Sequence, residues 1–239
     1  MKRQVTKLIA IAAAFVVIAA IAIYHQKTNA VADQNPGTNL ARMVPLEIEL
    51  PGPMYKGTDE PIRVDNLRKL DMGTRPPFLV PLGTTNVALG KPISASDEEP
   101  IIGEIGMITD GDKEAADGSY VELRPFLQHV TIDLEEPHEI FAVLVWHYHQ
   151  RARAYIDVIV QTASDPDFIT NVTTLFNNDI ENSAGLGIGT DMHYVETHKG
   201  ELIDAKGVKA RYVRLYSNGN TANDLNHYIE VEVYGRPAK

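Results

Sequence analysis

The sequence predicts an all-β fold. From Gln128 to the C-terminus, apolar and polar residues repeatedly alternate over strand-length segments, and a period of two marks a strand with one buried face. No segment shows the apolar spacing of a convincing amphipathic helix in this part of the chain. Hydrophobic residues make up 44% of the 239 residues, which is ordinary for a globular core. Many short strands with turn signals between them are typical of a β-sandwich.

The chain begins with an element that predicts export. Residues 2–7 contain three basic side chains, and the 17 residues from Leu8 to Tyr24 carry no charge. As a helix this run would span about 25 Å, slightly less than a hydrocarbon core of about 30 Å. Residues 1–32 are either a signal peptide cleaved after Ala30-Val31-Ala32 or an uncleaved anchor formed by residues 8–24. Both alternatives place the remainder in the periplasm or the extracellular space.

Residues 33–83 are expected to form an extended, proline-rich arm. Eight prolines interrupt this segment, and proline is disfavoured in helix interiors and central strands. The arm is either a flexible linker or a strap that lies against the domain or a partner. Within it, Leu46–Leu50 alternates apolar and charged residues, so a short edge strand is predicted there.

Residues 84–237 are predicted to form the β-domain. The segment Phe141–Trp146 is an almost uninterrupted apolar run, which indicates a central strand. The alternating segments, each predicted as a half-buried strand, are Gln128–Leu134, Tyr155–Thr162, Arg211–Tyr216 and Glu230–Tyr234.

Three motifs resemble the two ends of a discoidin domain, the coagulation factor V/VIII C-type or galactose-binding-like family. They are Asn86–Ser96, Ile108–Asp112, and the strand pair formed by Ala210–Ser217 and Tyr228–Gly235. The resemblance covers about residues 84–237 and implies a jelly-roll β-sandwich. It also implies a binding module that is mostly non-catalytic, often binds sugars and often holds a structural calcium ion.

A calcium site is predicted at the segment Met107–Asp112, where two carboxylates flank a glycine that permits a tight turn. Calcium needs six to eight oxygen ligands, so distant residues must contribute. An ordinary Asp-Gly turn is the alternative. The ligands that the resemblance implies are the Met107 carbonyl, Asp110, Asp112, Ser119, the Ile229 carbonyl and Glu230, with Asp117 as an outside candidate.

A ligand site is predicted in the segment Trp146–Tyr155, which holds one Trp, two His, two Arg and two Tyr in ten residues. In fucose-binding relatives the loop here carries arginines that bind sugar hydroxyls, and a guanidinium suits this role because it donates several hydrogen bonds in one plane. The segment lacks the Arg-x-Asp and paired cysteines of those lectins, so fucose is not assigned. The predicted ligand residues are His147, His149, Arg151, Arg153 and Tyr155.

Less specific roles remain open for the same residues. Trp146 fits a core position, and the two histidines fit ordinary hydrogen-bonded side chains or a zinc site whose third ligand is not evident. Arg151 or Arg153 fits an ion pair with the surplus of acidic residues.

Two polar loops, 177–191 and 218–227, combine glycine with Asn and Asp. This composition is typical of turns, but it also suits a surface that cradles a sugar or a cation. We therefore add Asn223, Asn226 and His227 to the predicted ligand residues.

Composition excludes several classes of function. The chain has no cysteine, which excludes disulfides and thiolate metal sites, and its net charge is −10. Nucleic acid and anionic lipid are not expected partners, because both need clustered basic residues. No Gly-x-Ser-x-Gly, phosphate-loop or His-Glu-x-x-His motif occurs, so no catalytic residue is assigned and we expect a protein that is not an enzyme.

The sequence thus predicts an exported, non-catalytic module that binds carbohydrate through loops at one end of a calcium-stapled jelly roll. Its expected partner is a glycan or a cell-envelope component. The alternative is a membrane-anchored structural or accessory subunit, which would join a larger membrane or envelope complex through the N-terminal helix and the arm.

Overall fold

The computed structural model describes residues 42–53, 56–57 and 61–238. The predicted export element, residues 1–32, lies outside them. Among the described residues, no helix is long and apolar enough to cross a membrane.

The elements are β1 (Met43–Pro45), β2 (Leu79–Pro81), β3 (Thr85–Asn86), β4 (Ile93–Ala95), the 3-10 helix η1 (Ile105–Thr109), β5 (Val121–Leu123), β6 (Gln128–Trp146), β7 (Ile159–Ala163), β8 (Thr173–Asn177), β9 (Glu201–Ser217), β10 (Asn226–Tyr228) and β11 (Glu230–Pro237).

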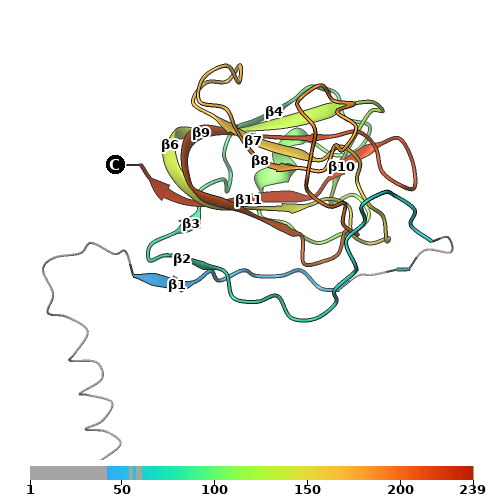
Figure 1. Ribbon diagram of the computed structural model, residues 1–239, viewed down its shortest axis with the longest axis horizontal. Helices are drawn as coiled ribbons and strands as arrows, with labels where there is room; N and C mark the ends of the chain where they lie inside the picture. The colour runs from blue at the N-terminus through green and yellow to red at the C-terminus, as the bar shows by residue number, and fades with distance from the viewer. Residues whose placement is uncertain (1–41, 54–55, 58–60, 239) are drawn as a thin grey trace, which may run out of the picture. The chain divides into compact units, whose positions relative to one another are not determined.

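The predicted all-β fold is confirmed for the described part of the chain. The main sheet has the order β3-β11-β6-β9-β7-β8, with β4 also paired to β6, and all of its strand pairs are antiparallel. Two smaller antiparallel pairs, β1-β2 and β5-β10, complete the fold (Figure 1).

The two longest strands, β6 and β9, bend together and turn the sheet into a sandwich (Figure 1). Their pairing shifts register between Asp133 and His138 and again between Ile140 and Ala142. Positive φ angles mark both bends, at Glu135 (67°) in β6 and at Lys206 (53°) in β9. Extra residues of this kind bend a strand and increase its twist. The N-terminal half of β6 therefore joins β4 and β7 in one layer, and its C-terminal half joins β11 in the other.

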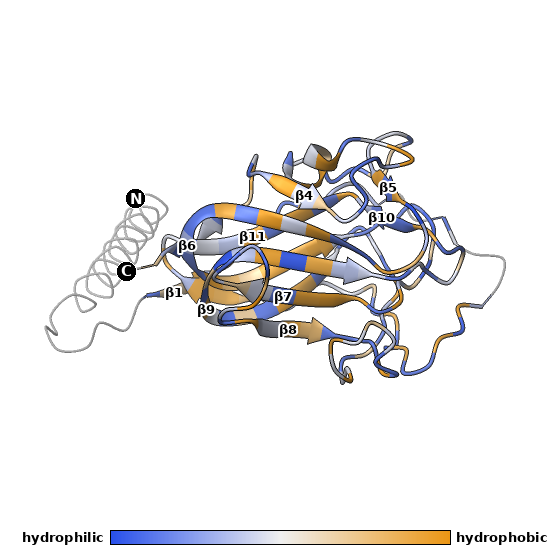
Figure 2. Cartoon of the chain, turned by 90° about the horizontal axis from the view of Figure 1, so that it is seen from above, coloured by the Kyte–Doolittle hydropathy of each residue, from blue (hydrophilic) through white to orange (hydrophobic). Residues whose placement is uncertain are grey.

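One hydrophobic core lies between these layers. It contains Ile132 from the first half of β6, Val143 from the second half, Leu215 from β9 and Val231 from β11, all fully buried. Most of the strands alternate hydrophobic and more hydrophilic residues along their length (Figure 2), as around Ile132 and Val231, whereas the neighbours of Val143 are apolar. Burying each such side chain contributes roughly 1.5–3 kcal/mol, so the alternation determines which face of each strand turns inward.

A second apolar cluster covers the opposite face of β6. Ala142, Leu144 and Trp146 point away from the main core and pack with Ile229 and Tyr234, and the arm residues Leu46, Ile48 and Phe78 cover them. The run Phe141–Trp146 is thus central, as predicted, and both of its faces are buried.

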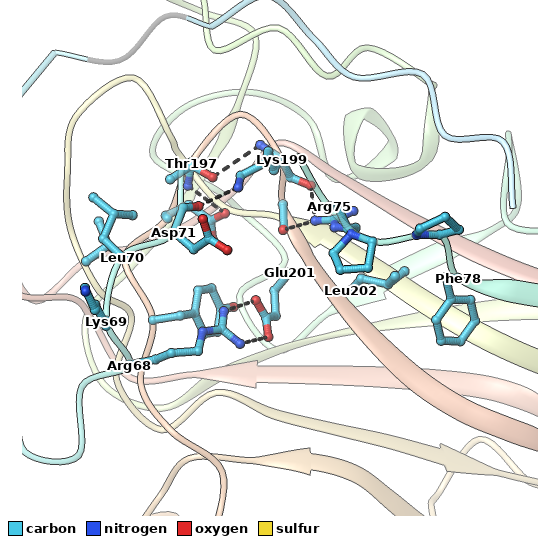
Figure 3. Close-up of a pocket in the computed structure, with 16 residues that line it drawn as sticks. Arg68, Lys69, Leu70, Asp71, Arg75, Phe78, Thr197, Lys199, Glu201 and Leu202 are labelled. Atoms are coloured by element: carbon cyan, nitrogen blue, oxygen red, sulfur yellow. Dashed lines mark hydrogen bonds and ion pairs between the residues drawn. The ribbon is translucent and has the colours of Figure 1, made fainter. Parts of the chain in front are cut away.

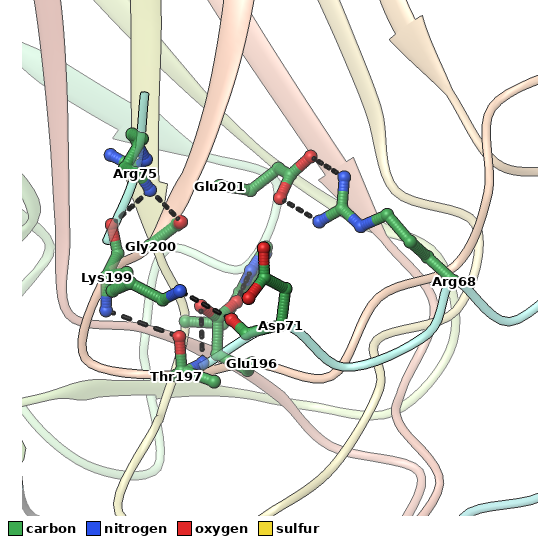
Figure 4. Close-up of polar contacts among 9 residues, drawn as sticks. Arg68, Asp71, Arg75, Glu196, Thr197, Lys199, Gly200 and Glu201 are labelled. Carbon is green, nitrogen blue, oxygen red and sulfur yellow. Dashed lines mark hydrogen bonds and ion pairs between the residues drawn. The ribbon is translucent and has the colours of Figure 1, made fainter. Parts of the chain in front are cut away.

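Polar contacts hold the arm in place. Arg68 donates two hydrogen bonds to the Glu201 carboxylate, at 3.0 and 2.5 Å, and Arg75 donates to the carbonyls of Lys199 and Gly200, both at 2.6 Å. The Lys199 ammonium in turn donates to the arm carbonyls of Asp71 and Gly73. Figures 3 and 4 show these groups converging around a hollow between the arm and the segment 194–202.

Of the two interpretations of the arm, the described part has the geometry of a strap. Its predicted edge strand at Leu46–Leu50 is wrong in position, because the paired strand is β1, at Met43–Pro45. The alternation still has a structural cause: Leu46 and Ile48 are half-buried against the second cluster, whereas Glu47 and Glu49 face solvent.

We predict that amides of the arm exchange slowly with solvent. The amides of Leu46, Lys56 and Arg68 donate to Phe78, Gln150 and His193 carbonyls at 2.7–2.8 Å. The substitution Phe78→Ala should speed their exchange, because it weakens the packing of the arm on β6. The amides of β6 should be unchanged, because pairing with β9 and β11 protects them.

Hydrogen–deuterium exchange read by NMR measures this. Lys69→Ala is the control, because Lys69 is exposed on the same segment. Rates near those of an unstructured peptide in the unsubstituted chain would contradict the docked arm.

Candidate functional site

A polar pocket lies where β5, β10, the segment after β6 and the arm meet. Its volume is about 230 Å³. Its walls combine three basic residues, two acidic residues and two tyrosines with amide and imidazole groups. The lining residues are Lys56, Asp117, Tyr120, Glu122, Tyr148, Gln150, Arg151, Arg153, Asn223 and His227.

Arg153 is the unusual member of this pocket. Only 7% of the residue is exposed, and its guanidinium lies 5.0 Å from the centre of the Tyr148 ring. Its Nε is buried without a hydrogen-bond partner. No carboxylate among the described residues forms an ion pair with it, although the notable surplus of acidic residues favours such pairing. A buried charge without a partner destabilises a fold, so the group has unused binding capacity.

Glu122 and His227 form the next part of the pocket. They are directly opposite each other in the β5-β10 pair, and His227 Nε2 lies 3.0 Å from Glu122 Oε2. Burial, with smaller effects from Arg153 and His147, lowers the pKa of His227 to about 3. Burial also raises the pKa of Glu122, against the opposing effect of Arg153. At neutral pH the imidazole is therefore uncharged, and the contact is a hydrogen bond rather than an ion pair.

Tyr148 and Gln150 are fixed by hydrogen bonds below the pocket. The Tyr148 hydroxyl donates to Gln150 Oε1 at 2.9 Å, and Gln150 Nε2 donates to the Ala115 carbonyl at 3.0 Å. Tyr120 packs against Tyr148 with ring centres 4.9 Å apart. Tyr120 itself is only half-buried, so part of its ring is available to a ligand.

Four of the eight predicted ligand residues line this pocket, namely Arg151, Arg153, Asn223 and His227. His147 and Tyr155 lie deeper instead. The His147 ring is stacked on Tyr155 with centres 4.3 Å apart, and its Nδ1 lies 3.0 Å from Glu196 Oε2. Both residues are almost fully buried.

His149 and Asn226 hold the surrounding backbone. His149 Nε2 lies 3.0 Å from the Lys113 carbonyl. Asn226 donates to the carbonyls of Arg124 and Phe126 and accepts a hydrogen bond from the amide of Gly219. The Asn226 contacts tie the loop 218–227 to the segment before β6, and neither side chain lines the pocket.

Six lining residues were not predicted as ligand residues: Lys56, Asp117, Tyr120, Glu122, Tyr148 and Gln150. Of these, Asp117 was considered only as an outside candidate for calcium. Tyr148 and Gln150 belong to the segment Trp146–Tyr155, so the unusual composition of that segment could have indicated them. Glu122 and Lys56 reach the site only through strand pairing and arm docking, which no local pattern reveals.

The predicted calcium loop lies beside the start of β11. The Gly111 amide, with φ of 91° at that residue, donates to Glu230 Oε2 at 3.1 Å. The carboxylates of Asp110 and Asp112 accept hydrogen bonds from the amides of Asp112 and Glu114. The Met107 carbonyl accepts from the Asp110 amide, whereas Ser119 and Ile229 pair with the backbone of Ala116 and Trp146.

Glu230 has a feature that bears on a cation. The residue is fully buried, and its Oε1 has no hydrogen-bond partner. Burial, together with the negative charges of Glu232 and Asp110, raises its pKa to about 9. No group of three or more His, Asp or Glu side chains in the described ranges is placed to hold a metal ion, so any calcium there would depend on backbone carbonyls as well.

The larger hollow under the arm, about 450 Å³ in volume, is a weaker candidate. Its principal charged groups, Arg68, Arg75, Lys199 and Glu201, already hydrogen-bond to one another or to backbone carbonyls (Figure 4).

No protein-family model matches the sequence, and no curated protein matches it. Among solved structures, the chain is similar to the CBM32 module of AlyQ in complex with 4,5-unsaturated mannuronic acid, at 17% identity and a TM-score of 0.43, over 59% of this chain and 92% of that one. It is also similar to chitosan-binding module 1 of a Paenibacillus sp. IK-5 chitosanase/glucanase, at 20% identity and a TM-score of 0.44, over 63% and 99%.

A third similar structure is the fucose-binding module SpX-3 of Streptococcus pneumoniae, at 18% identity and a TM-score of 0.44, over 63% of this chain and 97% of that one. All three are described as carbohydrate-binding modules. The fold assignment itself rests on the strand pairing given above.

The low pKa of His227 leads to a prediction about acid stability. The folded chain keeps this imidazole neutral, whereas the unfolded chain protonates it near pH 6.5, so its contribution is complete above pH 6.5 and declines toward about pH 3. At up to about 1.4 kcal/mol per pH unit, the unsubstituted chain should lose up to about 2 kcal/mol more than His227→Gln between pH 7 and pH 5.

Urea unfolding at both pH values measures the difference. Substitution of the exposed Asn223 by Ala serves as a control for changes in the same loop. Equal losses in the unsubstituted chain and in His227→Gln would mean that His227 titrates normally.

Proposed function

We propose that this protein is a non-catalytic carbohydrate-binding module whose ligand occupies the pocket around Arg153. The observation that carries the proposal is the buried guanidinium of Arg153, which has no ion-pair partner in the described chain and lies beside the Tyr120–Tyr148 pair. A guanidinium donates several hydrogen bonds in one plane, and an aromatic ring can pack on the apolar face of a sugar.

The size and chemistry of the pocket support a sugar ring. A volume of about 230 Å³ is below the roughly 300–1,000 Å³ typical of pockets for larger ligands. Basic groups would donate to sugar oxygens, and Glu122, Asp117 and Asn223 would accept from hydroxyls. No reaction is proposed at this site, and catalysis has no assigned residue.

Calcium belongs to this proposal as a structural ion. Its support is the buried, unpartnered Glu230 Oε1, the adjacent Asp110 and Asp112, and the tight turn at Gly111. Calcium here would join the loop after η1 to the last strand, and its positive charge would stabilise the ionised form of the buried Glu230 side chain. The Met107 and Ile229 carbonyls and Ser119 are the remaining proposed ligands.

Export and the alternative role as a membrane-complex subunit stay predictions. Export depends on residues 1–32, which lie outside the described part of the chain, and the alternative depends on those residues together with the arm.

The first prediction from this proposal concerns Arg153→Gln. Losing a charge-assisted hydrogen bond of about 1.5–3 kcal/mol should weaken binding of a glycan, first identified on a glycan array, by about 10- to 100-fold. The melting temperature should stay within a few degrees, because the substitution also removes an uncompensated buried charge.

Titration calorimetry and thermal melting measure the two effects. Arg153→Lys keeps the charge without the planar fork and should give an intermediate affinity, whereas Arg211→Gln, at a residue paired with Asp133, should bind normally. Undiminished binding by Arg153→Gln would contradict this location of the site.

The second prediction concerns calcium. At a concentration about 100 times its dissociation constant, calcium should stabilise the fold by about 2.7 kcal/mol, which corresponds to a rise in melting temperature of roughly 5–10 °C over the chelated protein.

Glu230→Gln provides the matched test. It preserves the shape and replaces a carboxyl group that can ionise to bind calcium with an amide that cannot. It should therefore abolish the calcium response without lowering the melting temperature in chelator, where Glu230 is already protonated at neutral pH. A calcium response that persists in Glu230→Gln, or no response in the unsubstituted chain, would contradict the proposed site.

A further inference from the structure

The candidate pocket gathers three basic residues, and none of them forms an ion pair with a carboxylate of the described residues. Elsewhere in the described part of the chain, six Lys and Arg residues do form such a pair. The six paired residues are Arg68, Lys91, Lys113, Arg124, Arg211 and Arg236. The three pocket cations are Lys56, Arg151 and Arg153.

These three cations share one pocket without a carboxylate partner although acidic residues are in excess. The chain carries 32 acidic and 22 basic residues, so acidic partners are abundant. Lys56 and Arg151 are exposed, so their repulsion is screened, whereas Arg153 is buried and its charge is not. An anion in the pocket would reach all three cations and compensate the buried one. The arrangement therefore favours an anionic group in the pocket.

The arm places Lys56 in this cluster. The Lys56 amide donates to the Gln150 carbonyl at 2.7 Å, and the Ala152 amide donates to the Lys56 carbonyl at 3.3 Å. This strand-like pairing puts Lys56 beside Arg151. The Lys56 ammonium contacts a neutral acceptor, Gln150 Oε1, at 3.3 Å, so its charge is not compensated by that contact.

The two acidic residues of the pocket do not cancel these charges. Glu122 lies against His227 Nε2 at 3.0 Å and forms no ion pair with any of the three cations, while burial raises its pKa against the opposing effect of Arg153. Asp117 is exposed to solvent, where its interaction with the cations is screened. Both can still accept hydrogen bonds from ligand hydroxyls.

We infer that the ligand is a negatively charged saccharide, whose carboxylate or sulfate group is bound by Lys56, Arg151 and Arg153 while its hydroxyls meet Glu122, Asp117 and Asn223. This inference rests on the proposed carbohydrate site and adds the class of sugar. It also makes the arm part of the binding site, because Lys56 comes from the arm.

The experiment compares charged glycans with their neutralised counterparts on the full chain. Oligogalacturonate and carboxyl-reduced oligogalacturonate form one pair, and carrageenan oligosaccharide before and after desulfation forms the other. We expect at least one charged member to bind about ten-fold or more tighter than its neutral counterpart, with an affinity that falls as salt is raised. The pair that responds identifies carboxylate or sulfate.

Two variants test which residues recognise the charge. Lys56→Gln and Arg151→Gln should each weaken binding of the charged glycan by about three- to five-fold, and they should leave the neutral glycan unchanged. Lys69→Gln and Arg63→Gln are matched controls, because they make the same change in net charge at exposed positions outside the pocket. These controls should have no effect.

The outcomes separate the two proposals. Neutral glycans that bind as tightly as charged ones, or equal losses in the pocket and control variants, would overturn the anionic class and leave a carbohydrate site standing. If no glycan binds, charged or neutral, the proposed function itself is overturned.

Discussion

The described structure depends on the pairing of two long, bent strands. β6 and β9 pair along nearly their whole length, and their shared register shifts let one sheet supply both layers of the sandwich. Because the strands bend together, the residues on either side of the bend, such as Ile132 and Val143, face a common core. The bend at Glu135 also sends the second half of β6 toward the segment that carries Tyr148 and Arg153, so the same constraint positions the candidate site.

The arm covers an apolar face that the paired strands alone would leave exposed. The second half of β6 is apolar on both faces, and an uncovered apolar face invites association. Leu46, Ile48 and Phe78 cover it, and the Arg68–Glu201 pair fixes the returning segment. In the described region the arm is therefore integral to the domain. A consequence for function is that Lys56 is held at the pocket by the same docking that buries Leu144 and Trp146.

Much of the fold was predictable, because period-two alternation reports local burial. Phe141–Trp146 was correctly predicted as a central strand, and Glu230–Tyr234 lies within β11. The sequence could not show that Gln128–Leu134 continues into the same strand, because Glu135, Glu136 and Pro137 look like a turn. Short strands such as β5 are stabilised by cross-strand contacts. Local patterns therefore missed both β5 and Glu122. They also missed Lys56, because nothing in the sequence around it indicates that the arm pairs with the segment that carries Arg151.

The pocket and the predicted calcium loop each border a buried ionisable side chain that lacks partners, a cation in the pocket and a carboxyl group beside the loop. Arg153 is a buried cation without an ion-pair partner, and Glu230 is a buried carboxyl group with an unpartnered oxygen. The two are not equivalent, because a carboxyl group can escape its burial cost by taking up a proton, whereas a guanidinium remains charged. The cost at Arg153 persists at any physiological pH until a ligand with oxygen acceptors arrives. A residue of this kind lowers the free energy of unfolding of the ligand-free domain. A ligand that compensates the buried charge recovers part of this lost free energy on binding. A ligand with a full negative charge compensates it better than one with hydroxyls alone.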